Sequence, residues 1–478
     1  MRTWPSREAR RSARFSAPRP ADAIPPSGRR VGSAAPCAAR RNACTSIAGG
    51  LAVSYQDAVR AAVVERREAL AAFAAELVRI PSLNPPGAEY RAVCEAIARS
   101  LAPLGFEARF LRAEGAPGDS DRFPRWNVVC RREGRGPGPC VHFNGHVDVV
   151  EVGEGWSVDP FAGVIRDGRV WGRGACDMKG GIAAAVIAAE AFLAVRPDFA
   201  GAIEISGTAD EESGGYGGVA WLAERGWFAP ERVQHVIIPE PLNKDRVCLG
   251  HRGVWWAEIE TKGRIAHGSM PFLGDCAVRH MGAVLAEMEA ALWPALAERE
   301  TAMPVAPAQA RRSTLNVNAI HGGEPERATG DTGLPAPNVP HSCRMVIDRR
   351  FLIEEDLAAV KGEMRALLER VAARRPGFRW SMRDLFEVLP TMTDADAPVA
   401  RALSAAVETA LGRPAEFVVS PGTYDQKHID RIGRLKNCVA YGPGVLDLAH
   451  QPDEWVGIDD MADAATVMAF ALDALLPR

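Results

Sequence analysis

The chain has 478 residues, and this length favours more than one domain, because single hydrophobic cores rarely grow beyond about 250–300 residues. Hydrophobic residues make up 47% and charged residues 24%, which is the composition of an ordinary globular protein. The formal net charge of −3 provides no global field for nucleic acid or an anionic membrane. We see no uninterrupted apolar run near the roughly 20 residues that a membrane helix needs, and we expect a cytoplasmic protein.

The first fifty residues differ in composition from the rest. They are rich in Arg, Ala, Pro and Ser, and their only acidic residues are Glu8 and Asp22. They lack the apolar core of a secretory signal, so we interpret residues 1–53 as a disordered leader or a mis-assigned start. An organelle transit peptide is the alternative, and we prefer a true start near Val53. The ten cysteines are scattered without a C-x-x-C pair, which favours reduced thiols over a disulfide framework.

Residues 54–251 alternate between helical and strand patterns. Val59, Val63, Leu70, Phe73 and Leu77 recur at helical spacing before Pro81, and a second helix closes at Gly105. Short apolar runs bounded by turn residues then predict buried strands, with Ala-rich helices between them. These runs cover residues 127–130, 140–143, 202–206 and 236–238. The alternation predicts an α/β sandwich around a largely parallel sheet.

A different pattern begins after Gly250. Residues 255–261, 315–320 and 343–348 read as strands, and residues 275–293 and 354–374 read as helices. This set is domain-sized. We therefore predict a small α+β domain over residues 252–377, inserted into a larger α/β domain that resumes over residues 378–478.

Polar side chains follow several of the predicted strands. His146 and Asp148 come directly after the run at 140–143, and ligands of open α/β sheets bind at the carboxyl ends of strands. Asp177 lies in a glycine-rich loop, Glu211 and Glu212 follow the next strand, and Glu240 follows another. Each motif has a plain structural explanation: a polar loop pair, a helix cap for Asp177, or an acidic helix start.

The motifs are more informative together. Five successive elements each place a His, Asp or Glu at the end of a strand-like run or in a loop beside one, and His450 completes the series. Two histidines and three carboxylates suit a pair of zinc ions about 3.5–4 Å apart that share one carboxylate.

From about Ala61 to the C-terminus, these motifs resemble the dinuclear zinc aminoacylase and carboxypeptidase G family, which includes acetylornithine deacetylase and succinyl-diaminopimelate desuccinylase. The resemblance implies a phosphorylase/hydrolase-like α/β catalytic domain interrupted by a ferredoxin-like lid that often dimerises. It also implies two divalent metal ions, with zinc expected and cobalt or manganese possible, and a homodimer.

The resemblance also implies roles for the motif residues. His146 and Glu240 would hold one metal ion, Glu212 and His450 the other, and Asp177 would bridge them. Asp148 would orient His146. Glu211 would take a proton from a metal-bound water, whose pKa falls to about 7, and pass it to the leaving nitrogen.

Further residues would contact the substrate. His267 of the lid would stabilise the oxyanion, in this family from the partner subunit, and Asn338 and Arg350 would bind the substrate carboxylate, although a surface ion pair also explains Arg350. Gly422 and Thr423 lie in the region of a substrate loop. Tyr424 and the Gln426-Lys427-His428 run depart from the family pattern, which leaves the acyl group open.

We therefore expect hydrolysis of the amide bond of a small N-acyl substrate that bears a carboxylate, as in a deacetylase or desuccinylase. The alternatives are a dipeptidase or carboxypeptidase, or hydrolysis of a carbamoyl or amidine-like C–N bond. A catalytically inactive binding protein on the same scaffold is a further alternative, which the complete set of ligands and base disfavours.

Overall fold

The computed structural model describes residues 53–323 and 337–478. The expected leader, except for Val53, lies outside these residues. The main body is a nine-stranded sheet with the order β1-β2-β6-β3-β7-β15-β8-β13, in which β14 also pairs with β8. Its strands are β1 (Glu107–Arg112), β2 (Trp126–Glu133), β3 (Cys140–His146), β6 (Ala202–Thr208), β7 (His235–Ile238), β8 (Arg246–His251), β13 (Thr391–Met392), β14 (Glu416–Ser420) and β15 (Cys438–Ala440).

The sheet is parallel in its centre and antiparallel at its flanks. Strands β6, β3, β7 and β15 run parallel to one another, as do β14 and β8. The pairs β1/β2, β2/β6, β8/β15 and β8/β13 are antiparallel. The prediction of a largely parallel sheet therefore holds only for the central strands, because strand periodicity does not reveal the direction in which neighbouring strands run.

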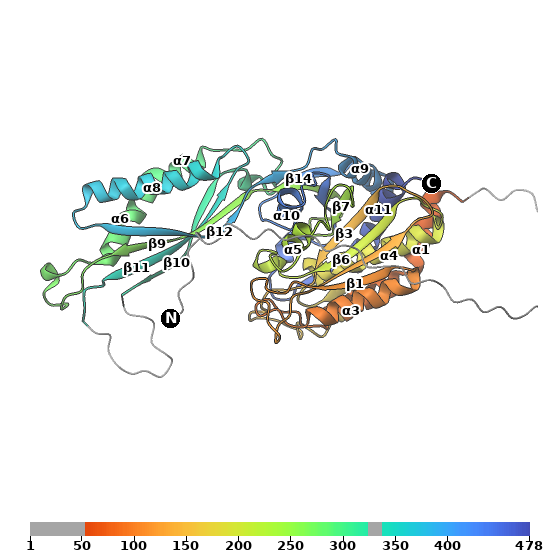
Figure 1. Ribbon diagram of the computed structural model, residues 1–478, viewed down its shortest axis with the longest axis horizontal. Coiled ribbons are helices and arrows are strands. Elements are labelled where there is room, and N and C mark those ends of the chain that lie inside the picture. Colours follow the sequence, from red (N-terminus) through yellow and green to blue (C-terminus); the bar gives the residue numbers. More distant parts are fainter. Residues whose placement is uncertain (1–52, 324–336) are drawn as a thin grey trace, which may run out of the picture. The chain divides into compact units, whose positions relative to one another are not determined.

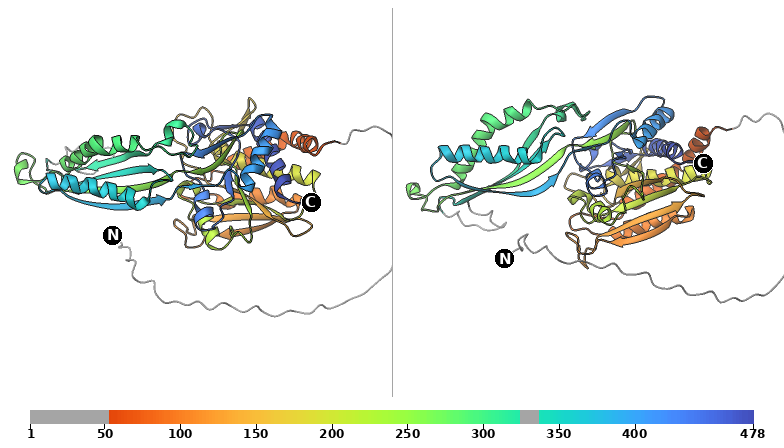
Figure 2. Two further views of the ribbon diagram at one scale, coloured as in Figure 1. Left: turned by 90° about the horizontal axis from the view of Figure 1, so that it is seen from above. Right: turned by 45° about the horizontal axis from the view of Figure 1, so that its top comes forward.

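Helices cover both faces of this sheet, as Figures 1 and 2 show. Val141, Phe143 and Ile237 point into one apolar core, whereas Cys140 and Val236 point into another on the opposite face. This explains why the central strands read as continuous apolar runs, since both faces are buried. The helices are α1 (Tyr55–Glu65), α2 (Arg67–Val78), α3 (Tyr90–Leu101), α4 (Gly180–Val195), α5 (Val219–Glu224), α9 (Pro398–Leu411), α10 (Gln426–Arg431) and α11 (Ile458–Leu475).

Helix α4 is the most apolar of these helices. Residues 175–195 are long and apolar enough on average to cross a membrane, although charged residues interrupt them, and 83% of their apolar 18-residue window is buried inside the protein. The helix packs against α1, α2 and α11. Its hydrophobicity is therefore that of a central core helix, which needs no lipid.

The inserted segment forms a separate four-stranded antiparallel sheet with the order β10-β11-β9-β12. Its elements in chain order are β9 (Gly253–Lys262), α6 (Ala277–Glu287), α7 (Trp293–Ala297), β10 (Thr314–Gly322), β11 (Ser342–Phe351), α8 (Leu357–Arg374) and β12 (Arg379–Val388). This β-α-β-β-α-β succession is the ferredoxin-like arrangement. Because β12 completes this sheet, the lid continues to Val388 and does not end at residue 377.

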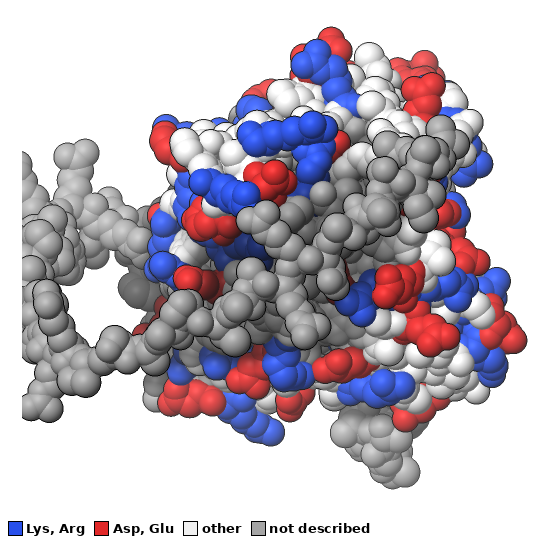
Figure 3. Space-filling model, turned by 90° about the vertical axis from the view of Figure 1, so that its right-hand side faces the viewer, with Lys and Arg blue, Asp and Glu red and all other residues white. Residues whose placement is uncertain are grey.

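A three-stranded sheet joins the C-terminal segment to the middle of the chain. Its strands are β16 (Trp455–Gly457), β5 (Arg169–Trp171) and β4 (Val164–Arg166). Trp455 lies opposite Trp171, so the segment after His450 is held beside the segment before Asp177. On the face shown in Figure 3, positive and negative side chains are interspersed wherever the surface is not covered, in agreement with the small net charge.

Two glycines allow a test of how tightly α4 packs under the sheet edge. A Cβ added at Gly181 would lie 1.9 Å from the carbonyl oxygen of Pro239, whereas one added at the exposed Gly282 of α6 would meet nothing within 4 Å. We predict that Gly181→Ala lowers the free energy of unfolding by about 1–3 kcal/mol, because the backbones must separate. Gly282→Ala should raise it by about 0.5–1 kcal/mol. Urea unfolding of both variants measures the difference, and equal effects would contradict it.

Candidate metal centre

The predicted ligands converge where the central strands end. His146 is the last residue of β3, Glu211 and Glu212 lie in the turn after β6, and Glu240 comes two residues after β7. Since β6, β3 and β7 are parallel, their carboxyl ends share one edge of the sheet. The loops that carry Asp177 and His450 complete the cluster.

Asp177 lies between the two histidines. Its Oδ1 atom is 3.0 Å from Nε2 of His146, and its Oδ2 atom is 3.5 Å from Nε2 of His450. His450 Nε2 is also 3.1 Å from Oε1 of Glu212, and the carboxylate of Glu240 lies close enough to Asp177 to feel its charge. Ligand atoms of His146, Asp177 and Glu212 lie within 4.8 Å of one another. One carboxylate that faces a histidine with each oxygen is the arrangement expected of a bridging ligand.

The electrostatics of the cluster favour a cation. Burial and the nearby charge of Asp177 raise the pKa of Glu240 well above its ordinary value. Burial likewise raises the pKa of Glu212 to about 7, and the hydrogen bond to Glu212 raises the pKa of His450 to about 9. Buried carboxylates that repel one another become stable as anions when a cation lies between them. Two imidazoles and three carboxylates form a donor set suited to zinc and related ions.

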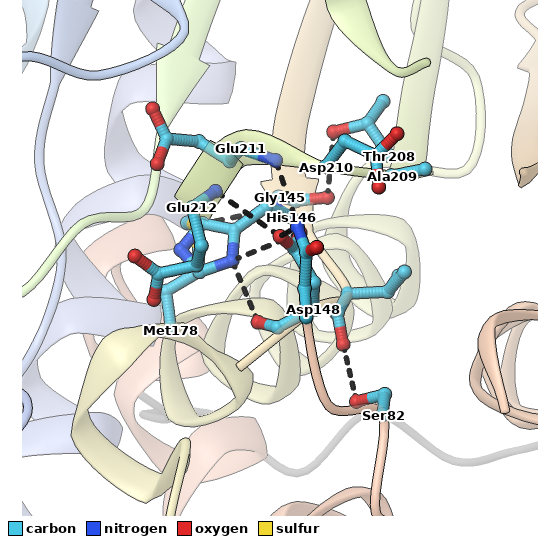
Figure 4. Close-up of polar contacts among 12 residues, drawn as sticks. Ser82, Gly145, His146, Asp148, Met178, Thr208, Ala209, Asp210, Glu211 and Glu212 are labelled. Atoms are coloured by element: carbon cyan, nitrogen blue, oxygen red, sulfur yellow. Dashed lines mark hydrogen bonds and ion pairs between the residues drawn. The ribbon is translucent and has the colours of Figure 1, made fainter. Parts of the chain in front are cut away.

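Asp148 acts differently from its predicted role. The ring of His146 is held by the backbone carbonyl of Asp148, which lies 3.0 Å from Nδ1, whereas the carboxylate is 3.7 Å away. This contact leaves Nε2 free to bind a metal ion. The buried carboxylate accepts hydrogen bonds from the backbone nitrogens of Glu211 and Glu212, at 3.1 Å each (Figure 4). It also accepts one from the side chain of Asn84 at 2.8 Å. It therefore fixes the turn that carries the base and one ligand.

Glu211 stands apart from the ligand cluster. Its Oε1 atom accepts a 2.5 Å charge-assisted bond from the buried Nζ of Lys427, and its carboxylate lines the same pocket as the ligands. Lys427 belongs to the run that departs from the family pattern, and sequence reasoning assigned it no role. In the sequence, only the departure from the family pattern singled out Lys427, because its partner Glu211 lies 216 positions away along the chain.

Glu211 and four of the predicted ligands, Asp177, Glu212, Glu240 and His450, line a pocket of about 250 Å³. Gly422 and Thr423, predicted to bind the substrate, lie in its wall together with Ser420 and Tyr424. Apolar side chains from the loops after β7 and β15 complete it, namely Pro241, Leu242, Leu446 and Ala449. A larger groove of about 690 Å³ beside β1 and β2 contains none of the predicted ligands.

The lid residues lie elsewhere within the part of the chain that the structure describes. His267, Asn338 and Arg350 do not line this pocket. His267 and Asn338 face each other in an isolated β-bridge, and Arg350 pairs with Asp348 at 2.8 Å. The structure of one chain thus brings together the five predicted ligands, the base and the substrate loop, but not the three lid residues.

An α/β domain interrupted by a ferredoxin-like domain, with this cluster at its sheet edge, defines a metal-dependent hydrolase. Residues 142–474 match the model of peptidase family M20/M25/M40, and the chain belongs to that family.

Succinyl-diaminopimelate desuccinylases are among its relatives. That of Thioalkalivibrio sulfidiphilus (strain HL-EbGR7) is 32% identical over 413 residues, which cover 84% of this chain and 98% of the relative. That of Methylobacterium sp. (strain 4-46) is 31% identical over 421 residues, which cover 85% and 96%.

Solved structures share the fold. Human carnosine dipeptidase 1 matches with a TM-score of 0.70 at 19% identity, over 88% of this chain and 99% of that one. The YXEP protein of Bacillus subtilis, a dinuclear metal-binding peptidase of family M20, matches with a TM-score of 0.60 at 16% identity, over 86% and 99%. The chain is therefore a hydrolase of amide or peptide bonds.

The observed role of Asp148 leads to a prediction. In Asp148→Asn, one amide N–H would face a backbone N–H of the Glu211–Glu212 turn, and the turn must shift. We expect a 10- to 100-fold loss of metal affinity or of kcat, the usual effect of removing an outer partner of a metal ligand. Elemental analysis and steady-state kinetics measure both. The exposed Asp121 offers the control Asp121→Asn, and equal behaviour of the two variants would refute the role.

Proposed function

We propose that the protein removes the N-acyl group from a small, amino-acid-like substrate with a free carboxylate, using zinc in its two-metal centre. One observation carries the proposal: four of the five ligand-type side chains line one small pocket together with Glu211, and the fifth, His146, contacts Asp177 in its wall. The names of the relatives, which are desuccinylases, support an acyl-transfer reaction of this kind.

The ligands divide into two sets around Asp177. His146 and Glu240 would hold one ion, Glu212 and His450 the other, and Asp177 would bridge them. When bound, such ions polarise the substrate carbonyl and make water a better nucleophile near pH 7.

Glu211 supplies the proton transfer. Lys427 occupies its Oε1 atom, which leaves Oε2 to accept the proton of the attacking water and to deliver it to the leaving nitrogen. The ammonium group of Lys427 fixes the carboxylate in place through a charge-assisted bond. Because Glu212 is committed to the metal centre, the neighbouring carboxylate of Glu211 remains available as the base.

The pocket supports a small substrate with an apolar portion. Its volume of about 250 Å³ is slightly below the range of ordinary small-molecule sites, which is about 300–1,000 Å³. Pro241, Leu242 and Leu446 form an apolar wall, while Ser420 and Thr423 offer hydroxyl groups. Such a wall suits the hydrocarbon part of an acyl group or an amino-acid side chain.

We also propose that the lid completes the site of a second copy of the chain. The imidazole of His267 is exposed, and among the described residues only its Nδ1 atom is engaged, by Ser269 at 2.7 Å. Phe272 and Leu273 beside it are 77% and 55% exposed, and Ile265 is 56% exposed. A contiguous exposed apolar surface of this kind is typical of an interaction site. A homodimer would bury it and bring His267 to the partner's pocket, where Asn338 and Arg350 would bind the substrate carboxylate.

A substrate panel tests the reaction. We expect the zinc-loaded protein to hydrolyse at least one of the N-acetyl, N-succinyl and N-formyl amino acids faster than dipeptides or N-carbamoyl amino acids. Removal of the metal ions by a chelator should abolish the activity. Zinc, cobalt and manganese should then be added back separately, to compare how much activity each ion restores. Glu211→Gln is the matched control, because it should keep the metal ions and the fold while lowering kcat by at least about 10²-fold. Preferred cleavage of dipeptides would replace this proposal with a dipeptidase, and activity that survives complete chelation would refute the metal mechanism.

Complementation between two inactive variants tests the shared site. His267→Ala keeps the metal centre and the base, whereas Glu211→Gln keeps the lid histidine. Heterodimers formed after subunit exchange would contain one intact composite site, so mixing should restore part of the wild-type rate. Exchange is verified by native mass spectrometry. Absence of recovery despite exchange would mean that His267 does not serve the partner's pocket.

A further inference from the structure

We propose that the buried ion pair of Arg173 and Glu454 positions the two metal ligands Asp177 and His450 and thereby sets the metal affinity of the centre. The inference deepens the proposed function and rests on it. Arg173 and Glu454 contact neither the pocket nor the substrate loop, so both are positioning residues. They are among the least exposed charged side chains of the described chain, at 2% and 1%.

Glu454 holds the backbone at the bridging ligand. Its Oε1 atom accepts hydrogen bonds from the backbone nitrogens of Cys176 at 2.8 Å and Asp177 at 3.1 Å. Its Oε2 atom accepts a 2.6 Å bond from Arg173. Both oxygens of one carboxylate are thus used, one on the loop of Asp177 and one on the guanidinium.

Arg173 connects the same carboxylate to the second ligand loop. Its guanidinium donates to the carbonyl oxygens of His450 at 3.3 Å and Gln451 at 3.2 Å. It also donates to the carbonyl oxygens of Glu151 at 3.1 Å and Val152 at 3.2 Å, in the loop a few residues after His146 and Asp148. One fixed fork of N–H donors therefore holds two loops, and through Glu454 it reaches a third.

The backbone of His450 needs such support. Its φ angle of 63° lies in the left-handed region, which is uncommon for a residue other than glycine. A backbone in that region persists where surrounding contacts hold it. The bonds from Arg173 to the carbonyls of His450 and Gln451 are contacts of this kind.

The fold around the pair is secured by other contacts. Strands β16 and β5 form a backbone ladder, and the nitrogen of Gly172 donates to the carbonyl oxygen of Glu454 at 2.9 Å. These bonds do not involve the two side chains, so the loops stay adjacent without the pair. What the side chains add is the position of the ligand-bearing residues within those loops. Loss of such outer partners typically weakens metal binding 10- to 100-fold.

The test measures zinc affinity by competition with a chelator, together with thermal unfolding of the metal-free protein. The variants are Arg173→Lys, which keeps the charge but loses the fork, Glu454→Gln, which keeps the shape, and the double variant Arg173→Met/Glu454→Leu, which removes both charges together. The matched control is the exposed pair of Arg67 and Asp459, changed to Arg67→Met and Asp459→Asn.

We expect each Arg173 and Glu454 variant that folds to bind zinc 10- to 100-fold more weakly than the wild type, and the control variants to bind it equally well. The double variant secures the test, because removing both partners leaves no unpaired buried charge to prevent folding. A lower unfolding temperature of the metal-free protein with unchanged zinc affinity would mean that the pair is merely structural and would overturn the inference. A wild type that binds no zinc would instead overturn the proposed function.

Discussion

Three buried carboxylates, Asp177, Glu212 and Glu240, lie against one another at one edge of the central sheet, and their mutual repulsion is the constraint around which the site is built. Removing a carboxylate from water is costly unless it is paired. Burial and mutual charge raise the pKa of Glu212 and Glu240, and the two histidines supply only part of the compensation. A pair of divalent cations would satisfy the whole set, and the stability of this region would then be linked to metal binding.

The fold keeps these groups together against that repulsion by means of the backbone. Parallel central strands place the turns after β3, β6 and β7 at one edge. Buried groups behind the ligands then fix their backbones: Asp148 holds the turn of Glu211 and Glu212, and Glu454 holds the loop of Asp177. Close packing of Gly181 against Pro239 keeps α4 directly beneath the strand end that precedes Glu240.

The two parts of the chain contribute different groups. The α/β domain contains the pocket, which is lined by four of the predicted ligands and by Glu211. The ferredoxin-like domain presents His267 beside exposed apolar side chains, and its Arg350 is paired with Asp348. Under the proposed function, different surfaces of the protein would recognise the acyl group and the carboxylate.

The sequence by itself determined the fold class and the family, and it predicted an inserted domain and five candidate metal ligands, because strand periodicity and the polar residues after each run are local patterns. It also indicated Glu211 as the base through its position beside a ligand. Only the tertiary structure decided that β12 belongs to the lid, that the backbone carbonyl of Asp148 orients His146, and that Lys427 pairs with Glu211. It likewise decided that Arg173 pairs with Glu454, 281 positions away. These contacts depend on which loops meet in space, and a charged residue in a sequence carries no mark of its distant partner.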